Sequence, residues 1–323
     1  MQKIRNRRIG SYLAPTLLVS ALAGCLLSGC RAQIQPSTTI AVGKGPDAIY
    51  PTADGRYLYV ANVEDTKISV IELETNSVAS EIKVALGPWG FARLPGGRVA
   101  ASSWEGEVNI IDEKEGTLLS SHKTKSHLGG IVPALNGKSV FVVGVDADRV
   151  FRMEVQSGRI IQEIATGAGP DGIGLGNGGK DLYVACTKSG TIEIFSTESG
   201  TKIESFEVGG KPELIHATHD LKTLYISNFH RGLVHIIDTT DRKIVHEIEG
   251  IEGPEEAVPD ESKRILYVAA FNAQKILAYD LDSLEKLPVE YATGSKPIGV
   301  LSVGNRLFVT NYGDNSVGRY LME

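Results

Sequence analysis

The sequence predicts an all-β fold, a seven-bladed β-propeller with four-stranded antiparallel blades. A turn built on Gly-Pro or Lys-Pro recurs along the 323-residue chain, and short β-rich runs separated by turn residues follow each recurrence. The spacing, near 42 residues, is typical of a four-stranded propeller blade. Helical repeats of this length need ten or more residues at a 3.6-residue period, and the frequent β-branched residues and turn signals leave no room for them.

The recurring turn sets the number of blades. Its prolines are Pro46, Pro88, Pro170, Pro212, Pro254 and Pro297. They lie 42, 82, 42, 42 and 43 residues apart, and the long gap holds Leu128-Gly129-Gly130 at its midpoint. The gap therefore spans two periods, and the chain contains seven units.

Each unit contains three further phrases after the turn. The second phrase is Tyr59-Val60-Ala61-Asn62 in the first unit, and a β-rich run such as Ile68-Ser69-Val70-Ile71 follows it. A turn, often opened by Asp as at Asp112, leads to a fourth short run such as 78–84. The second and third phrases are apolar on both faces, as expected for blade sheets that are covered by a neighbour on each side.

The two ends of the chain are expected to complete one blade together. The last unit supplies only three strands, ending near Tyr320, while residues 38–42 form a strand without a blade of its own. Pairing of these segments closes the ring and removes an open edge. We therefore assign residues 38–323 to the propeller.

These phrases carry a family resemblance. The Tyr-Val-Ala-Asn phrase, with the Pro-Asp turn before it and the Ile-Ser-Val-Ile strand after it, resembles the YVTN family of β-propeller repeats over about residues 38–323. Units two and three match least well. The resemblance implies a seven-bladed propeller, commonly in exported or surface proteins, but no single chemistry. Related propellers include lactonase-like enzymes and periplasmic binding proteins.

The N-terminus has the features of a bacterial lipoprotein signal. Four basic residues precede an apolar stretch from about residue 12 to residue 27, which ends in two successive lipobox patterns, Leu22-Ala23-Gly24-Cys25 and Leu27-Ser28-Gly29-Cys30. We favour Cys30 as the lipidated residue because the chain turns polar after it, and Cys25 is the alternative. Residues 1–30 are then the signal peptide and residues 31–37 a tether. Several acyl chains suffice for stable anchoring.

Composition and motifs restrict the classes of function. Residues 1–30 hold four basic residues and no acidic one, so the formal net charge of −6 becomes −10 from residue 31 onward. An acidic body argues against nucleic-acid binding and against a membrane contact other than the lipid anchor. We expect no cofactor, because the sequence lacks haem, Walker A and Gly-x-Ser-x-Gly signatures. Cys186, in a predicted strand, is expected to be a buried inert thiol.

One face of the propeller is expected to carry the functional site, since the loops between blades and the loops between second and third strands emerge there. We predict ligand-binding residues on this face: Trp89, Trp104, Asp47, Asp171, Glu213, Glu255 and His230. The only two tryptophans form either a stacking platform or a hydrophobic plug over a degenerate blade. The acidic residues that follow the turn proline in four units either bind a cation or basic ligand or are solvated repeat positions.

Two other residue sets are interpreted as structural. Five of the seven histidines lie in unit five, but His216, His219 and His230 fall on different parts of the predicted blade, so we expect no metal site. The recurring Asn62, Asn228 and Asn311 are expected to cap turns through hydrogen bonds to the backbone.

The sequence thus favours a non-enzymatic binding or scaffold module, exported and lipid-anchored on the cell envelope. Its partner is an unidentified envelope protein or small ligand at the funnel face. The alternative is a lactonase-like propeller hydrolase that uses the funnel carboxylates. An enzyme needs titratable groups that converge on one point with hydrogen-bonded supporting residues, and this requirement separates the two hypotheses.

Overall fold

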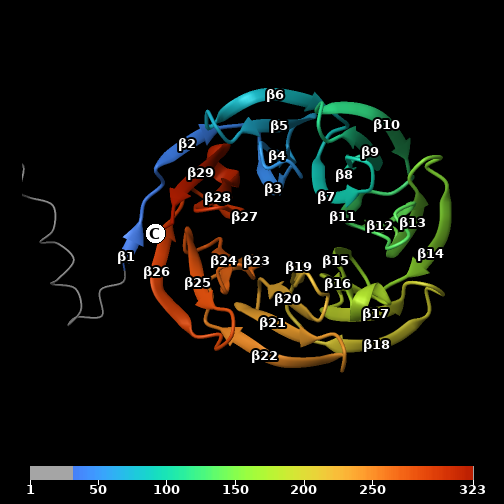
Figure 1. Ribbon diagram of the computed structural model, residues 1–323. Helices are drawn as coiled ribbons and strands as arrows, with labels where there is room; N and C mark the ends of the chain where they lie inside the picture. The colour runs from blue at the N-terminus through green and yellow to red at the C-terminus, as the bar shows by residue number, and fades with distance from the viewer. Residues whose placement is uncertain (1–31, 323) are drawn as a thin grey trace, which may run out of the picture. The chain divides into compact units, whose positions relative to one another are not determined.

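The computed structural model describes residues 32–322, and these residues form a closed ring of seven β-sheets (Figure 1). The predicted signal segment 1–30, with Cys25 and Cys30, lies outside the described residues. The only helical elements in the described part are two short 3-10 turns, η1 (Asn177–Gly179) and η2 (Tyr312–Asp314). The predicted all-β, seven-bladed propeller is therefore confirmed. No helix among the described residues is long and apolar enough to span a membrane.

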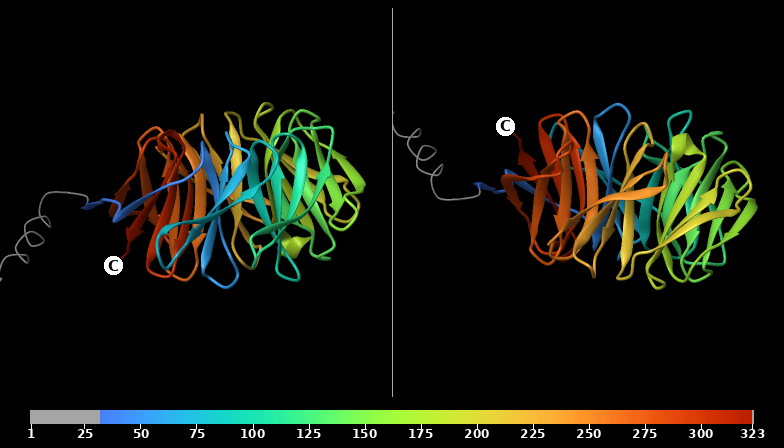
Figure 2. Two further views of the ribbon diagram at one scale, coloured as in Figure 1. Left: turned by 90° about the horizontal axis from the view of Figure 1, so that it is seen from above. Right: turned by 90° about the horizontal axis from the view of Figure 1, so that it is seen from below.

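Each blade is an antiparallel meander whose first strand lies nearest the ring axis and whose fourth lies at the rim (Figures 1 and 2). Blades one to three comprise β3 (Pro46–Pro51), β4 (Tyr57–Asn62), β5 (Lys67–Glu72), β6 (Ser77–Lys83); β7 (Pro88–Leu94), β8 (Arg98–Ser103), β9 (Glu107–Asp112), β10 (Thr117–Lys123); and β11 (Leu128–Pro133), β12 (Ser139–Gly144), β13 (Arg149–Glu154), β14 (Ile160–Ala165).

Blades four to six follow the same order. They comprise β15 (Pro170–Gly176), β16 (Asp181–Cys186), β17 (Thr191–Ser196), β18 (Lys202–Glu207); β19 (Pro212–Ala217), β20 (Thr223–Asn228), β21 (Leu233–Asp238), β22 (Lys243–Glu249); and β23 (Pro254–Asp260), β24 (Ile265–Ala270), β25 (Lys275–Asp280), β26 (Lys286–Ala292).

Blade seven is completed from both ends of the propeller. It contains β27 (Pro297–Val303), β28 (Arg306–Asn311) and β29 (Ser316–Leu321), and β2 (Thr38–Ala41) is its outer strand. Ile40 pairs with Val317, and the register continues from Thr38 to Ala41. Figure 1 shows β2 beside β29, at opposite ends of the colour scale. The predicted closure by the N-terminal strand is confirmed.

The assigned tether contains a strand that the sequence analysis missed. β1 (Ala32–Ile34) hydrogen-bonds to the outer strand β26, which makes blade six five-stranded. Ile34 also packs against the hydrophobic cluster between blades six and seven. The reason is that β26 offers an unpaired edge, and the chain passes beside it on the way to β2.

The core lies between the blades. The second strands are buried along nearly their whole length, as in β4 and β16, and the third strands are similar. Fully buried Tyr59, Tyr183 and Tyr267 come from equivalent positions of three blades. Burial on both faces confirms the expectation from the apolar phrases. It also leaves the first strands free to line the central channel.

Candidate functional site

Each inner strand begins with a β-bulge, and the bulge positions the candidate site residues. In β3 the pairing with β4 shifts between Pro46 and Ile49, and the other six inner strands show the same shift after the turn residue. Bulges redirect side chains at the ends of strands. The residues directly after the turn residue form what we call the funnel ring: Asp47, Trp89, Gly129, Asp171, Glu213, Glu255 and Ile298. All of these except Gly129 line one cavity.

Neighbouring inner strands approach closely just below the ring because the next residue is often glycine. A Cβ atom on Gly172 would lie 1.8 Å from the carbonyl oxygen of Glu213, and one on Gly299 would lie 2.4 Å from that of Asp47. Thr310 Oγ1 donates a 2.7 Å hydrogen bond to the same Asp47 carbonyl. The ring residues are thus fixed by the adjacent blade.

The funnel ring brings together five of the predicted site residues, and four of them are carboxylic acids. Asp47 is 8% exposed and Glu213 is 4% exposed. Burial, followed by repulsion from Glu256, Asp171 and Glu213, raises the pKa of Asp47 to about 8. Burial and Glu213 raise the pKa of Asp171 to about 6. Burial, Glu213 and Asp47 also raise the pKa of Glu255. Ionisation of the ring is therefore costly without added positive charge.

One lysine partly neutralises the ring. Lys211 Nζ pairs with Glu213 Oε1 and lies 5.4 Å from the centroid of the Phe229 ring. Burial lowers the pKa of Lys211, but the hydrogen bond and charge of Glu213 outweigh it, so the pKa is raised. Among residues 32–322, no donor reaches the buried Glu213 Oε2, although Glu213 shares a side-chain hydrogen bond with Glu255. No residue in this range forms a hydrogen bond or an ion pair with the Asp47 carboxylate. Buried polar groups normally have partners.

Glu256 is a further acid, which lines the channel cavity together with Asp47, and sequence analysis missed it. Its Oε1 lies 2.8 Å from His216 Nε2, and its Oε2 accepts a 2.6 Å hydrogen bond from the Val300 amide. Unlike Asp47, this carboxylate is fully partnered. Its signal was present in the sequence, since Glu256 occupies the position where four other blades have glycine.

Two cavities follow one another along the axis. The cavity at the funnel mouth has a volume of about 250 Å³, and Lys211 and Tyr312 complete its lining beside the ring residues. The channel cavity measures about 290 Å³ and is lined by inner-strand side chains such as Ile49, Ile131 and Ile173. Asp47, Trp89 and Leu214 border both cavities. The site is therefore a charged mouth that leads into an apolar channel.

The tryptophans stack on each other, but only one borders the cavities. Trp89 lies in β7 rather than in a loop and stacks on Trp104 at 5.8 Å between ring centroids. Trp104, 38% exposed, also stacks on His127 at 4.7 Å, nearly parallel. His127 Nδ1 lies 2.7 Å from the Trp104 carbonyl oxygen. Trp89 is thus the wall of the site, and Trp104 and His127 support it from outside.

The remaining candidates lie apart from the cavities. His230 is exposed, packs edge-on against Phe229 and lines neither cavity. The histidines of blade five do not converge: His216 faces the channel, and His235 is buried in β21. Within residues 32–322, no group of three His, Cys, Asp or Glu side chains is close enough to hold a metal ion.

Two structural expectations are confirmed. Asn228 Oδ1 accepts a hydrogen bond from the Lys211 amide, and Asn311 Oδ1 accepts one from the Gly294 amide, so these side chains cap turns. Asn62 makes the opposite contact, since its Nδ2 donates a hydrogen bond to the Lys67 carbonyl. Cys186 is buried, and burial raises the pKa of its thiol to about 11.

Comparison with known proteins establishes the fold alone. No family model matches the chain, and no curated protein sequence matches it. Among solved structures, Kuenenia stuttgartiensis hydrazine synthase is similar with a TM-score of 0.75 and 18% identity, over 86% of this chain and 96% of that one. The β-propeller domain of Cps50 (Swd1) from Myceliophteria thermophila is similar with a TM-score of 0.76 and 10% identity, over 89% and 99%. At these identities the chain shares their seven-bladed propeller architecture.

Proposed function

We propose that this protein is an exported, lipid-anchored binding module of the bacterial cell envelope, and that the funnel ring is its binding site. The observation that carries the proposal is the pair of buried acids at the mouth cavity: no described residue hydrogen-bonds to the Asp47 carboxylate, and Lys211 pairs with Glu213 through Oε1 alone. Preorganised polar groups at a largely apolar concavity are typical of ligand sites. The lipobox patterns and the resemblance to YVTN repeats support the envelope location.

A propeller hydrolase is the second candidate, and one observation favours it. The pKa of Asp47, about 8, keeps a proton available near neutral pH, as a general acid requires. Two other observations favour a binding site without catalysis. No described residue lining the channel cavity is Ser, Thr or Cys, and nothing hydrogen-bonds to the Asp47 carboxylate to orient it for proton transfer. We therefore propose binding without a reaction.

The anchor is tested by labelling cells with an alkyne fatty acid and fractionating them. The wild-type protein is expected to carry the label and to sediment with membranes. Cys30→Ala should lose the label and Cys25→Ala should retain it. The reverse pattern would assign the lipid to Cys25, and an unlabelled wild-type protein would refute the anchor.

The binding role is tested by a pull-down from envelope extracts, comparing the wild type with Trp89→Ala/Trp104→Ala. At least one component should be recovered with the wild type and lost with the double variant. His219→Ala, at an exposed blade-five turn, is the matched control. Equal recovery of every component by all three proteins would contradict a binding site at the funnel.

A further inference from the structure

The funnel mouth contains four carboxyl groups, and Lys211 is the cation that pairs with one of them. Asp47 and Glu213 are more than nine-tenths buried, and both line the mouth cavity. No described donor reaches Glu213 Oε2, and Glu213 shares a side-chain hydrogen bond with Glu255, whose pKa is raised. The charges that act on the Asp47 carboxylate are those of other acids. Leaving a buried acceptor unsatisfied costs free energy, and the cost is larger when the acceptor is charged. A ligand with hydrogen-bond donors and positive charge removes this cost.

The protein already holds one ammonium group at this mouth. Lys211 Nζ contacts Glu213 Oε1 and lies over the face of Phe229. Carboxylate on one side and an aromatic face on the other is a favourable setting for an ammonium. Trp89 offers a second aromatic ring on the same cavity, next to Asp47 in the ring order, and the structure gives it no cation. Asp47 and Trp89 therefore provide a second carboxyl group and aromatic face at the mouth, and no described cation lies between them.

The channel beyond the mouth favours an apolar group. Its lining is dominated by aliphatic and aromatic side chains from the inner strands, including Ile49, Phe91 and Ile131. Burial of such surface against an apolar group stabilises a complex. The volume of about 290 Å³ suits a short alkyl or single-ring group. Because Asp47 and Trp89 border both cavities, one ligand can contact both.

We infer that the funnel binds a primary organic ammonium, with its NH₃⁺ group on Asp47 and Glu213 beside Trp89 and its apolar body in the channel. The inference deepens the proposed function and rests on it. A primary ammonium fits better than a quaternary one because three N–H donors match the free carboxylate oxygens. It also fits better than a bare divalent ion, since no described cluster of three ligating side chains is close enough to coordinate one.

The test uses phenethylammonium as the probe and isothermal titration calorimetry on the full chain at pH 8. Saturable binding at one site is expected. The neutral analogue 2-phenylethanol and the trimethylated phenethylammonium should each bind at least tenfold more weakly. Equal binding of the alcohol would contradict the charge recognition, and equal binding of the trimethylated ion would contradict the hydrogen-bonded NH₃⁺ group. Displacement of the probe by equimolar CaCl₂ would identify a metal site instead.

Variants locate the probe. Asp47→Asn/Glu213→Gln should weaken binding at least tenfold, and Trp89→Leu about fivefold or more. Asp282→Asn, whose exposed carboxylate pairs with Arg264, should bind like the wild type. Circular dichroism and thermal melting verify that each variant is folded. If folded Asp47→Asn/Glu213→Gln binds the probe as the wild type does, the assignment is wrong. If no variant or wild-type protein binds the amine while the tryptophan-dependent pull-down succeeds, the ligand class fails and the binding role stands.

Discussion

At the scale of single residues, the funnel ring departs from the rule that buried charges are paired. Asp47 has no cationic partner among residues 32–322, and Lys211 forms its ion pair with Glu213 while its charge also favours ionisation of Asp171 and Glu255. Folded proteins retain such groups at functional sites more often than elsewhere. The alternative reading of the acidic positions, as solvated repeat residues, does not fit Asp47 and Glu213, because both are buried.

The first prediction concerns the pH dependence of stability. The pKa of Asp47 is about 8 in the folded protein and about 3.9 in an unfolded chain. Between these values the folded state binds more protons, so stability falls as pH rises from about 4 to about 8. Asp47→Asn should remove much of this slope. Thermal melting at pH 5 and pH 9 measures it.

At pH 9 the free energy of unfolding of Asp47→Asn should exceed that of the wild type by on the order of 3 kcal/mol, and at pH 5 the two should differ little. Glu74→Gln, at an exposed turn position, is the control and should parallel the wild type at both pH values. Parallel pH profiles for Asp47→Asn and the wild type would contradict the raised pKa.

At the scale of elements, the inner strands depend on glycine where two backbones meet. The third residue of β15 is Gly172 and the third residue of β7 is Gly90, so the two positions are equivalent. A Cβ atom on Gly172 would overlap the Glu213 carbonyl oxygen at 1.8 Å, whereas one on Gly90 finds its nearest neighbour at 3.4 Å. The ring is therefore tighter between blades four and five than between blades two and three.

The second prediction follows from this difference. Gly172→Ala should destabilise the protein by about 2–3 kcal/mol, because the added methyl group displaces the backbone of β19, and a backbone shift costs more than a side-chain adjustment. Gly90→Ala should change stability by less than about 1 kcal/mol. Urea denaturation of the two variants checks the pair. Similar losses for both would show that inner-strand approach does not limit packing at Gly172.

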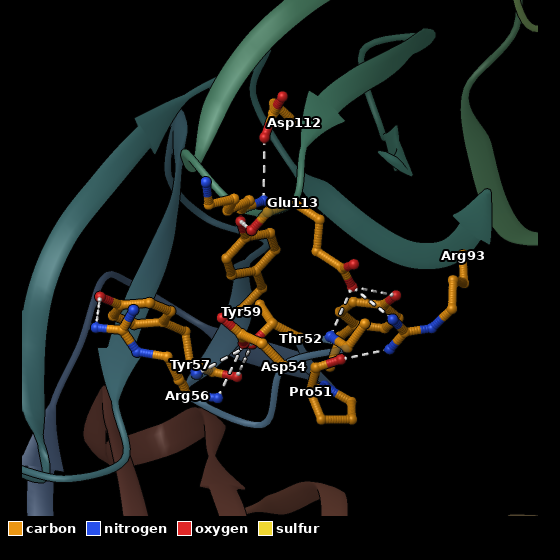
Figure 3. A network of polar contacts seen from close by, with 12 residues as sticks. Pro51, Thr52, Asp54, Arg56, Tyr57, Tyr59, Arg93, Asp112 and Glu113 are labelled. Carbon is orange, nitrogen blue, oxygen red and sulfur yellow. Dashed lines mark hydrogen bonds and ion pairs between the residues drawn. The ribbon is translucent and has the colours of Figure 1, made fainter. Parts of the chain in front are cut away.

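Blades one and two are joined at the opposite ends of their inner strands by a polar network (Figure 3). Glu113 accepts hydrogen bonds from the Tyr50 hydroxyl at 3.0 Å, the Ala53 amide at 3.1 Å and Arg93 Nη1 at 2.7 Å. Arg93 also donates to the Pro51 carbonyl and lies 4.9 Å from the centroid of the Tyr50 ring. One buried carboxylate thus connects three groups from two blades.

The third prediction is that Glu113→Ala destabilises the protein by about 2–4 kcal/mol, because it leaves the Ala53 amide and the Tyr50 hydroxyl without their acceptor. Glu113→Gln should recover part of the loss, since its amide oxygen still accepts hydrogen bonds. Glu115→Ala in the same turn, where the side chain is 64% exposed, should cost less than about 0.5 kcal/mol. Chemical denaturation at pH 7 distinguishes the three, and equal stability of Glu113→Ala and Glu115→Ala would contradict a joining role.

At the scale of the whole molecule, the repeat made the fold predictable. Period, blade count and closure by residues 38–42 all follow from turns and apolar phrases that recur, because a blade can only be buried by blades like itself. The repeat also pointed to the funnel ring through the residue after the turn proline. It did not reveal β1, since an edge strand of three residues has no periodic signal, nor the stacking of Trp104 on His127, which joins two blades.

The acidic mouth shows a second limit of reading a repeat. In blade six, Glu256 replaces the glycine found at this position in four other blades. Only the structure shows that its carboxylate contacts His216 and accepts a hydrogen bond from the Val300 amide. Such contacts between side chains of different blades depend on the rotation that relates each blade to its neighbour about the ring axis. A repeat in the sequence specifies equivalent positions but not the distances between them across a ring.

The fourth prediction concerns ring closure. β2 pairs with β29 and with no other strand, and Ser37 and Val42 extend the ladder through hydrogen bonds to Arg319 and Asn315. A chain that begins at Val42 loses this strand and exposes the β29 edge, which is a template for pairing with another chain. We expect its melting temperature to fall by roughly 10 °C or more and the protein to self-associate.

A chain that begins at Pro36 keeps β2 but loses β1, so it should melt within a few degrees of the chain that begins at Arg31 and stay in the same oligomeric state. Melting curves and size-exclusion chromatography of the three chains separate the contributions, because β1 only lengthens blade six whereas β2 completes blade seven. An equal melting temperature for the chains that begin at Val42 and at Pro36 would mean that the ring is held shut by inter-blade packing alone.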